Sequence, residues 1–387
     1  MLITDNKTLA SFCDDVRSAP YITVDTEFLR EKTYYATLCL VQVGYGEHFA
    51  AVDALARGLD LAPLFELLND PGIIKVFHAA KQDLEIFHRL CGRVPAPLFD
   101  TQIAATVCAF GEQPGYATLV QKMLDVELDK ASQATDWTVR PLTQRQIDYA
   151  LGDVIHLCPI YEQLQQRLSE SGRDAWVKEE MEDLLDEGHY RVDPDESWRR
   201  IKIRRPSRET LGVLRELAAW RERTAIDRDL PRNWVIRDDA LAEIAQHAPK
   251  NRQQLGRTRG LRENITHGKD GGAILEGIER ALARPEDEWP SLPERRASLS
   301  GHETLVALMQ ALLKLRCEAE GVAMKLVATR SELDLLATSE EPDVRAVHGW
   351  RREVFGSDAL ALREGRLALT GDGLSVKAVE LAGRESR

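Results

Sequence analysis

The pattern of apolar residues changes about halfway along the chain, and this change is the strongest constraint on the fold. In the first 190 residues, short β-branched runs alternate with segments whose apolar side chains recur at helical spacing. The strand-like runs are Tyr21–Glu27, Leu38–Gly44, His48–Val52 and Ile73–Phe77. Helices are expected at Leu61–Leu68, Asp83–Leu90, Thr101–Phe110, Tyr116–Leu124 and from Thr143 to about Leu168. This alternation predicts an α/β domain with a mixed sheet.

From Arg208 onward the sequence contains only amphipathic helical segments separated by Gly and Pro, and no strand is expected there. Trp234–Ala245 aligns without gaps on Leu326–Ala337, with Asp239 and Ser331 as the expected N-caps. We therefore predict two copies of a small helical module, with coincidence between Leu-rich helices as the alternative. The predicted boundaries are 1–190 for the α/β domain, 191–207 for a basic linker, 208–286 for the first helical domain and 295–375 for a second, diverged one.

Composition excludes several classes of protein. No stretch approaches the roughly 18 consecutive apolar residues of a membrane span, and the N-terminus lacks the basic and apolar regions of a secretory signal. The six cysteines form no CxxC pair and have no histidines at zinc spacing. We expect reduced thiols in a cytoplasmic protein that does not contact a membrane and is a monomer.

Two acidic residues, Asp25 and Glu27, stand two positions apart on the first predicted strand. At about 3.3 Å per residue, their side chains project from the same face of the strand. Two carboxylates on a mostly buried strand require neutralisation, and hard carboxylate oxygens favour Mg²⁺ or Mn²⁺ over zinc. The alternative for this pair alone is a strand end whose acids face solvent.

Two more acids are placed by their spacing. Asp83 follows the Ile73–Phe77 strand, where α/β proteins position their sites, although an Asp at a helix start is commonly a cap. Tyr149 and Asp153 are four residues apart and share a helix face. A metal-binding carboxylate would then have a phenol one turn away, but for the pair in isolation a core tyrosine beside a surface acid is the favoured interpretation.

In this order, the three acidic elements resemble the motifs of the DEDDy 3′–5′ exonucleases. Other segments are similar to the ribonuclease D family: VDTEFLRE, LCLVQVG after the tyrosines 34 and 35, FHAAKQDLEIF, and DWTVRPLTQRQIDYALGDV. The helical modules resemble the HRDC domain, of which ribonuclease D has two. The resemblance implies an RNase H-like mixed sheet flanked by helices, followed by two all-α HRDC-type domains.

The resemblance also implies the roles of the site residues. Asp25, Glu27, Asp83 and Asp153 match the carboxylates that surround two divalent metal ions, Mg²⁺ or Mn²⁺, and Tyr149 matches the tyrosine beside the attacking water. Two ions roughly 4 Å apart can stabilise both the attacking and the leaving oxygen of an in-line phosphoryl displacement. With an ordinary pKa near 10, the phenol would stay neutral and orient the water by a hydrogen bond.

Several residues near these motifs are candidates for RNA contact. They are Phe28, Gln42, His78, Trp137 and Arg140. The alternatives are core packing and strand pairing for Phe28 and Gln42, and a structural histidine for His78. The net charge of −12 conceals a basic block, because residues 199–262 contain 17 lysines and arginines against 8 acidic residues. Within it, Arg204 and Arg205 are expected to bind phosphates without reading sequence, although a solvated charged face is the simpler reading of such a run.

We therefore expect a metal-dependent 3′–5′ exoribonuclease that releases nucleoside 5′-monophosphates. The family resemblance implies tRNA precursors and other small structured RNAs as substrates. Two alternatives remain open, a related exonuclease acting mainly on DNA and a catalytically inactive RNA-binding adaptor. The intact acidic set argues against the adaptor, whereas only the whole-chain resemblance favours RNA over DNA.

Overall fold

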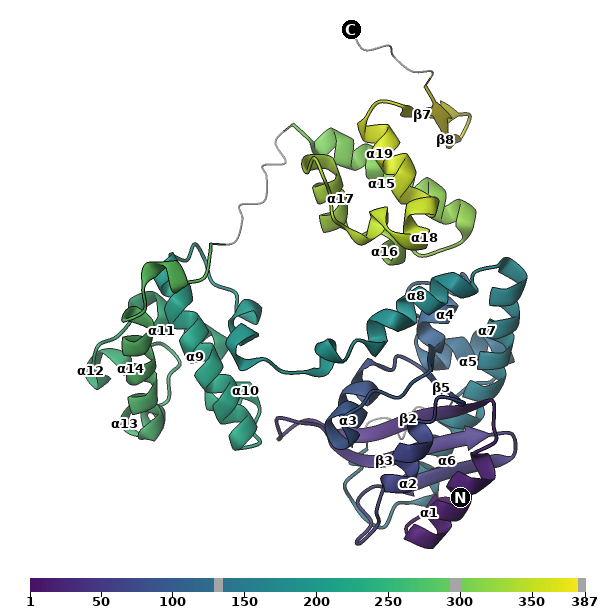
Figure 1. Ribbon diagram of the computed structural model, residues 1–387, viewed down its shortest axis with the longest axis horizontal. Helices are drawn as coiled ribbons and strands as arrows, with labels where there is room; N and C mark the ends of the chain where they lie inside the picture. The colour runs from purple at the N-terminus through teal and green to yellow at the C-terminus, as the bar shows by residue number, and fades with distance from the viewer. Residues whose placement is uncertain (129–134, 293–300, 382–387) are drawn as a thin grey trace. The chain divides into compact units, whose positions relative to one another are not determined.

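A computed structural model describes residues 1–128, 135–292 and 301–381 (Figure 1). The chain forms two compact units. Unit 1 contains Met1–Glu27, Cys39–Glu187 and Arg295–Arg387, and unit 2 contains Phe28–Leu38 and Gly188–Glu294. The β2–β3 loop of the sheet thus belongs to the second unit. Residues 295–300, the start of the second predicted helical domain, and Pro293 lie outside the described residues.

Unit 1 contains a six-stranded mixed sheet with the strand order β1-β4-β3-β2-β5-β6. Pairing is parallel for β1 with β4, β2 with β5 and β5 with β6, and antiparallel for β3 with β4. The strands are β1 (Leu2–Ile3), β2 (Tyr21–Leu29), β3 (Thr37–Tyr45), β4 (His48–Asp53), β5 (Ile74–Phe77) and β6 (Leu98–Asp100). The mixed sheet expected from the sequence is confirmed. The short strands β1 and β6 were not expected.

Successive residues of β2 and β3 are buried on both faces of the sheet, from Tyr21 to Val24 and from Leu38 to Gly44. Burial on both faces means that helices cover both sides of these strands. The helices of this domain are α1 (Asn6–Val16), α2 (Ala62–Leu68), α3 (Lys81–Cys91), α4 (Thr101–Val107), α5 (Tyr116–Leu124), α6 (Gln144–Ile155), α7 (Leu157–Ser171) and α8 (Asp174–Leu185).

The single helix expected from Thr143 to Leu168 is two helices, α6 and α7, which meet at His156. Pro159 explains the break, because proline has no N–H group to continue the helical hydrogen bonds and is tolerated only in a first turn. The start of α6 is as expected, with a capping box between Thr143 and Gln146. The break matters for the site because it fixes the end of the helix that contains Tyr149 and Asp153.

Unit 2 is a helical domain joined to the β2–β3 loop. Its helices are α9 (Arg208–Asp227), α10 (Arg232–Val235), α11 (Asp238–His247), α12 (Arg252–Leu255), α13 (Glu263–His267) and α14 (Lys269–Leu282), preceded by 3-10 turns at Glu187–Tyr190 and Pro194–Arg200 and followed by another at Glu286–Glu288. Apolar residues of α9, α11 and α14 form its core, which also includes Tyr34 from the loop.

The C-terminal part of unit 1 is a second set of helices. They are α15 (Glu303–Glu320), α16 (Met324–Val327), α17 (Arg330–Thr338), α18 (Gly349–Arg351) and α19 (Ser357–Arg363), with a 3-10 turn at Arg345–Val347 and a π-helical turn at Arg352–Gly356. The expectation of a strand-free C-terminal half was wrong. Strands β7 (Leu367–Asp372) and β8 (Ser375–Glu380) form an antiparallel hairpin around Gly373, whose positive φ of 64° suits the tight turn.

The aligned segments of the two helical regions fold alike, because Val235 and Val327 each end a one-turn helix, α10 and α16. The expected N-caps were two residues too late. The helix α11 is preceded by Arg237, and α17 is preceded by Thr329, which forms a capping box with Glu332. A Thr–x–x–Glu capping box satisfies two backbone donors reciprocally and so outcompetes a serine within the first turn.

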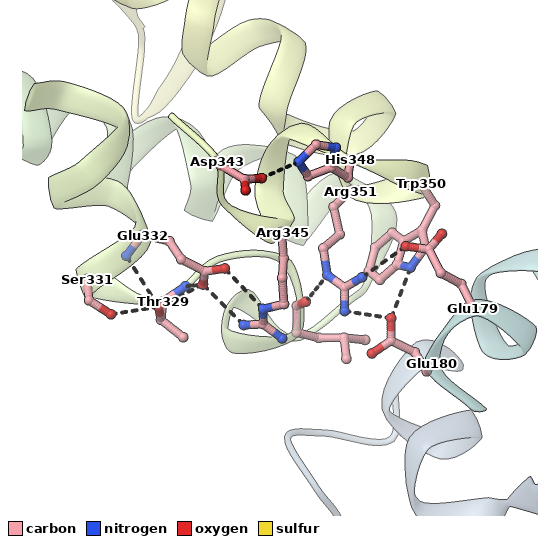
Figure 2. A network of polar contacts seen from close by, with 11 residues as sticks. Glu179, Glu180, Thr329, Ser331, Glu332, Asp343, Arg345, His348, Trp350 and Arg351 are labelled. Atoms are coloured by element: carbon pink, nitrogen blue, oxygen red, sulfur yellow. Dashed lines mark hydrogen bonds and ion pairs between the residues drawn. The ribbon is translucent and has the colours of Figure 1, made fainter. Parts of the chain in front are cut away.

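The C-terminal helices pack on α8 within unit 1 (Figure 2). The rings of Trp176 and Trp350 are stacked with centroids 4.5 Å apart. The buried Arg351 forms ion pairs with Glu180 at 2.5 Å and Glu179 at 3.4 Å. Among the helices of the described chain, none combines the length and the apolar character that a membrane crossing requires.

Candidate active site

Three carboxylates from two elements converge in unit 1. Asp25 and Glu27 alternate with the buried Thr26 on β2, so they share a face, and Asp153 approaches them from α6. One oxygen from each of these three carboxylates lies within 4.8 Å of the others. The strand spacing and the helix spacing predicted from the sequence therefore bring these residues together.

Burial makes these carboxylates hard to ionise. It raises the pKa of Asp25 to about 7, which a hydrogen bond from the Thr26 backbone only partly opposes. Burial, followed by repulsion from Asp25 and Asp153, raises the pKa of Glu27 to about 9. Burial and then Asp25 raise the pKa of Asp153 to about 8. The charges that act on Glu27 and Asp153 are all negative, and a bound cation would offset this repulsion.

The fourth predicted carboxylate, Asp83, is in the first turn of α3 and is buried. Its Oδ1 accepts a hydrogen bond from the Thr26 hydroxyl. It is not one of the three residues that lie within 4.8 Å of one another. Burial and then Asp25 raise its pKa, and its own charge adds to the raised pKa of Glu27. The charge of Asp83 therefore interacts with the charges of Asp25 and Glu27. We call Asp25, Glu27, Asp83 and Asp153 together the acidic group.

Tyr149 lies one helical turn before Asp153 on α6. Burial raises the pKa of its phenol above the ordinary value, and repulsion from Asp153 and Glu27 adds to the effect. The phenol is therefore a neutral hydrogen-bonding group at physiological pH. Beside it, a pocket of about 460 Å³ extends along the helix, and Tyr149, Asp153 and His156 are among its lining residues.

Two residues that the sequence reasoning missed hold Asp153 in place. The half-buried Tyr116 donates its hydroxyl to the backbone oxygen of Asp153. The Thr23 hydroxyl donates to the backbone oxygen of Val154 at 2.9 Å and so fastens the same helix to β2. Neither contact has a local signal in the sequence, because the partners are separated by 37 and 131 positions.

Of three predicted RNA contacts, Gln42 and Trp137 are buried and His78 is half-buried. Gln42 is fully buried on β3, and within the described residues its amide has no hydrogen-bond partner. His78 Nδ1 lies 3.0 Å from the Thr101 hydroxyl, while Nε2 is buried without a described partner. Trp137 is buried, and the centre of its ring lies 6.2 Å from the centre of the Tyr149 ring. Contact with RNA stays a prediction for all three.

The remaining predicted contacts are placed differently. Arg140 donates to both carboxylate oxygens of Asp53, at 2.6 and 2.7 Å, and to the Cys39 backbone oxygen, which gives it a structural role. Phe28 is half-buried near the end of β2. Arg204 and Arg205 are exposed and form no ion pair with any described residue. Their contact with RNA also stays a prediction.

The donor set at this site fits divalent metal ions. Its ligand atoms are hard carboxylate oxygens, which suit Mg²⁺ and Mn²⁺ rather than zinc or copper. Within the described chain this is the one group of three or more such residues close enough to share an ion. A half-buried cluster of carboxylates beside a neutral phenol and a pocket is typical of a hydrolytic metal site.

The fold and the site define a 3′–5′ exonuclease domain followed by an HRDC domain. Residues 1–169 match the family described as 3′–5′ exonuclease, and residues 210–278 match the HRDC domain. The chain is 46% identical to ribonuclease D of Granulibacter bethesdensis over 379 residues, which cover 98% of this chain and 96% of that protein. It is 45% identical to ribonuclease D of Acidiphilium cryptum, over 98% and 97% of the two chains.

A solved structure agrees with these sequences. The chain resembles Escherichia coli RNase D, an exoribonuclease involved in structured RNA processing, with a TM-score of 0.83 and 33% identity over 94% of this chain and 98% of that one. This chain belongs to the ribonuclease D family. It is a hydrolase of the 3′–5′ exoribonuclease type.

Proposed function

We propose that the acidic group cleaves the last phosphodiester of an RNA chain and releases a nucleoside 5′-monophosphate. Asp25, Glu27, Asp83 and Asp153 would hold two divalent ions, Mg²⁺ or Mn²⁺. The ions would supply a hydroxide near neutral pH and would stabilise the charge that develops on the leaving 3′ oxygen. The observation that carries this proposal is the convergence of three half-buried carboxylates with raised pKa values.

Tyr149 would act by position rather than by proton transfer. Its raised pKa keeps the hydroxyl protonated, so it can donate a hydrogen bond to the attacking water or accept one from it. The pocket beside it along α6 would receive the 3′-terminal nucleotide. Tyr116 would hold Asp153 in its position through the hydrogen bond to the Asp153 backbone oxygen.

The substrates proposed are tRNA precursors and other small structured RNAs, in line with the ribonuclease D relatives. The basic linker and the first helical domain would bind the RNA backbone, with Arg204 and Arg205 among the contacts. The C-terminal helices would form a second, diverged HRDC-like domain, because α16 and α17 repeat α10 and α11. We propose a monomer in the cytoplasm, where its six free thiols stay reduced.

The test is hydrolysis of 5′-labelled RNA and DNA oligonucleotides of matched sequence by the purified chain. With Mg²⁺ or Mn²⁺, RNA should shorten stepwise from its 3′ end with release of nucleoside 5′-monophosphates, and EDTA should stop the reaction. Asp153→Asn removes a charged ligand and should lower kcat by about 10³-fold or more. Exposed Asp15, on α1 and outside the pocket along α6, is the matched control, and Asp15→Asn should retain activity within about threefold.

The outcomes separate the alternatives. Faster degradation of DNA than of RNA would favour the exonuclease that acts on DNA. RNA binding without hydrolysis under any metal condition would favour the inactive adaptor. Equal activity of Asp153→Asn and the unchanged chain would show that the acidic group does not take part in the reaction.

A further inference from the structure

Unit 2 contains a pocket of about 320 Å³ that is lined mainly by charged side chains. The charged residues are Arg30, Arg200, Arg221, Arg232, Glu222 and Asp238. We call this pocket the arginine pocket. Its residues come from the β2–β3 loop, the turn before α9, and the helices α9, α10 and α11, so distant segments of the sequence build it together.

The loop side of the pocket is fixed by Tyr34, which is buried. Its hydroxyl donates to Glu222 and accepts from Arg232 Nη2 at 2.8 Å, and the Arg232 guanidinium lies 4.6 Å from the centre of its ring. Asp229 accepts from the Tyr34 backbone N–H at 3.1 Å. The wall is therefore held rigidly before any ligand arrives, which lowers the entropic cost of binding.

The pocket has more positive than negative charge. Both of its carboxylates are already engaged, Glu222 by Arg232 at 2.6 Å and Asp238 by Arg221 at 2.6 Å. Four guanidinium groups against two carboxylates leave a net charge of about +2. Arg200 is exposed and forms no ion pair with the residues that the structure describes. An anion would therefore be attracted without first displacing an internal carboxylate.

One donor in the lining lacks an acceptor. Arg221 is only 3% exposed, and its Nη1 donates to the Ile236 backbone oxygen and to Asp238. Its Nε is buried and, across residues 1–128, 135–292 and 301–381, has no hydrogen-bond partner. A buried cationic N–H without an acceptor is costly, and a phosphate oxygen is an acceptor that guanidinium groups bind well.

An exposed aromatic residue directly follows one of the pocket residues in the sequence. Asn233 lines the pocket, and the next residue of α10, Trp234, is 49% exposed. A flat aromatic surface in water stacks readily on a nucleic-acid base of any sequence. The aligned positions of the C-terminal helices do not repeat this arrangement, because Met324 and Leu326, which pack on an apolar core, replace Arg232 and Trp234.

We propose that the arginine pocket binds a phosphate of a single-stranded RNA backbone and that Trp234 stacks on a nearby base. The proposal rests on the proposed function, since it names a contact for the RNA that the acidic group would shorten. The pocket itself would not read sequence, because phosphates and stacked rings are common to every RNA. The same chemistry could also take the phosphate of a free nucleoside monophosphate.

The test is the affinity of the full chain for a labelled single-stranded RNA 20-mer, measured by fluorescence anisotropy in EDTA across a series of salt concentrations. Arg200→Ala should weaken binding several-fold and lower the slope of log Kd against log salt by about 0.7, the value for one phosphate contact to a single strand. Trp234→Ala should weaken binding about fivefold or more with the slope unchanged, because stacking releases no counterion.

Arg257→Ala is the matched control, because Arg257 is an exposed arginine of unit 2 outside the pocket. It should leave affinity and slope unchanged. If Arg200→Ala and Arg257→Ala behave alike, the pocket is not an RNA site. If Arg200 is needed to bind AMP but not RNA, the pocket takes free nucleotides and the assignment to RNA is overturned. Binding in EDTA does not involve metal, whereas loss of hydrolysis in Asp153→Asn tests the acidic group separately.

Discussion

Two carboxylates in different parts of the molecule have pKa values shifted in opposite directions. Glu222 in unit 2 is fully buried, and burial alone would raise its pKa, yet hydrogen bonds from Arg232 and Tyr34 lower it. Glu27 on β2 is partly buried, and its pKa rises to about 9 because burial is reinforced by Asp25 and Asp153. Glu222 is therefore paired with a positively charged side chain of the same chain, whereas the charged groups that act on Glu27 are other acids.

This difference distinguishes a carboxylate with a structural role, Glu222, from a carboxylate suited to bind a ligand cation, Glu27. An acid that is paired inside the fold stabilises the native state as an anion, and its removal leaves an unpaired arginine. Acids crowded together without a cation destabilise the native state when they ionise, and a bound divalent ion reverses the sign of that effect. The same substitution of glutamate by glutamine is therefore expected to act oppositely at the two positions.

The largest expected effect on stability is at the paired acid. Glu222→Gln should destabilise the chain by about 3 kcal/mol, because it leaves Arg232 without its counter-charge and leaves a single oxygen to accept from both Arg232 and Tyr34. Urea unfolding followed by tryptophan fluorescence measures the change. The control is Glu209→Gln on the exposed side of the same helix α9, which should change stability by less than about 0.5 kcal/mol. Equal midpoints for the two variants would show that the Glu222 pairing contributes no stability.

The pairing partner of Glu222 shows where sequence reasoning reached its limit. Tyr34 could be recognised as part of a family-like segment, but its contacts are 188 and 198 positions away, and no local pattern encodes them. The acidic group was predictable because alternation on a strand and spacing of four on a helix fix side-chain direction locally. The β7–β8 hairpin had a local signal in Asp372–Gly373, which its largely exposed strands obscured.

A smaller effect is expected at Tyr149, and it falls on the reaction rather than on stability. Tyr149→Phe should lower kcat by about 10- to 100-fold and change KM by less than about threefold, because the phenol orients the water but adds little to binding. Steady-state hydrolysis of labelled RNA separates the two parameters. Tyr45→Phe, at the end of β3, is the control and should match the unchanged chain. A normal kcat in Tyr149→Phe would exclude the positioning role.

The smallest expected effect is the pH-dependent change in stability at Glu27. It is the most direct test of the comparison between Glu27 and Glu222. Between the ordinary pKa of glutamate and about 9, the folded metal-free chain keeps a proton on Glu27 that the unfolded chain releases. Stability should therefore fall as pH rises through this window and level off above it. Glu27→Gln cannot ionise, so without metal it should be more stable than the unchanged chain by on the order of 1 kcal/mol at pH 8.5, and nearly equal at pH 5.

Divalent metal should reverse this ranking. Mg²⁺ or Mn²⁺ should raise the melting temperature of the unchanged chain more at pH 8.5 than at pH 6, because fewer protons must be displaced from the carboxylates at higher pH. The increase should shrink in Glu27→Gln, which keeps one fewer anionic ligand. Thermal unfolding of both proteins, with EDTA and with metal at each pH, gives all the required midpoints. If Glu27→Gln instead destabilises the metal-free chain as Glu222→Gln does, the two carboxylates are equivalent and the acidic group is not arranged to bind a cation.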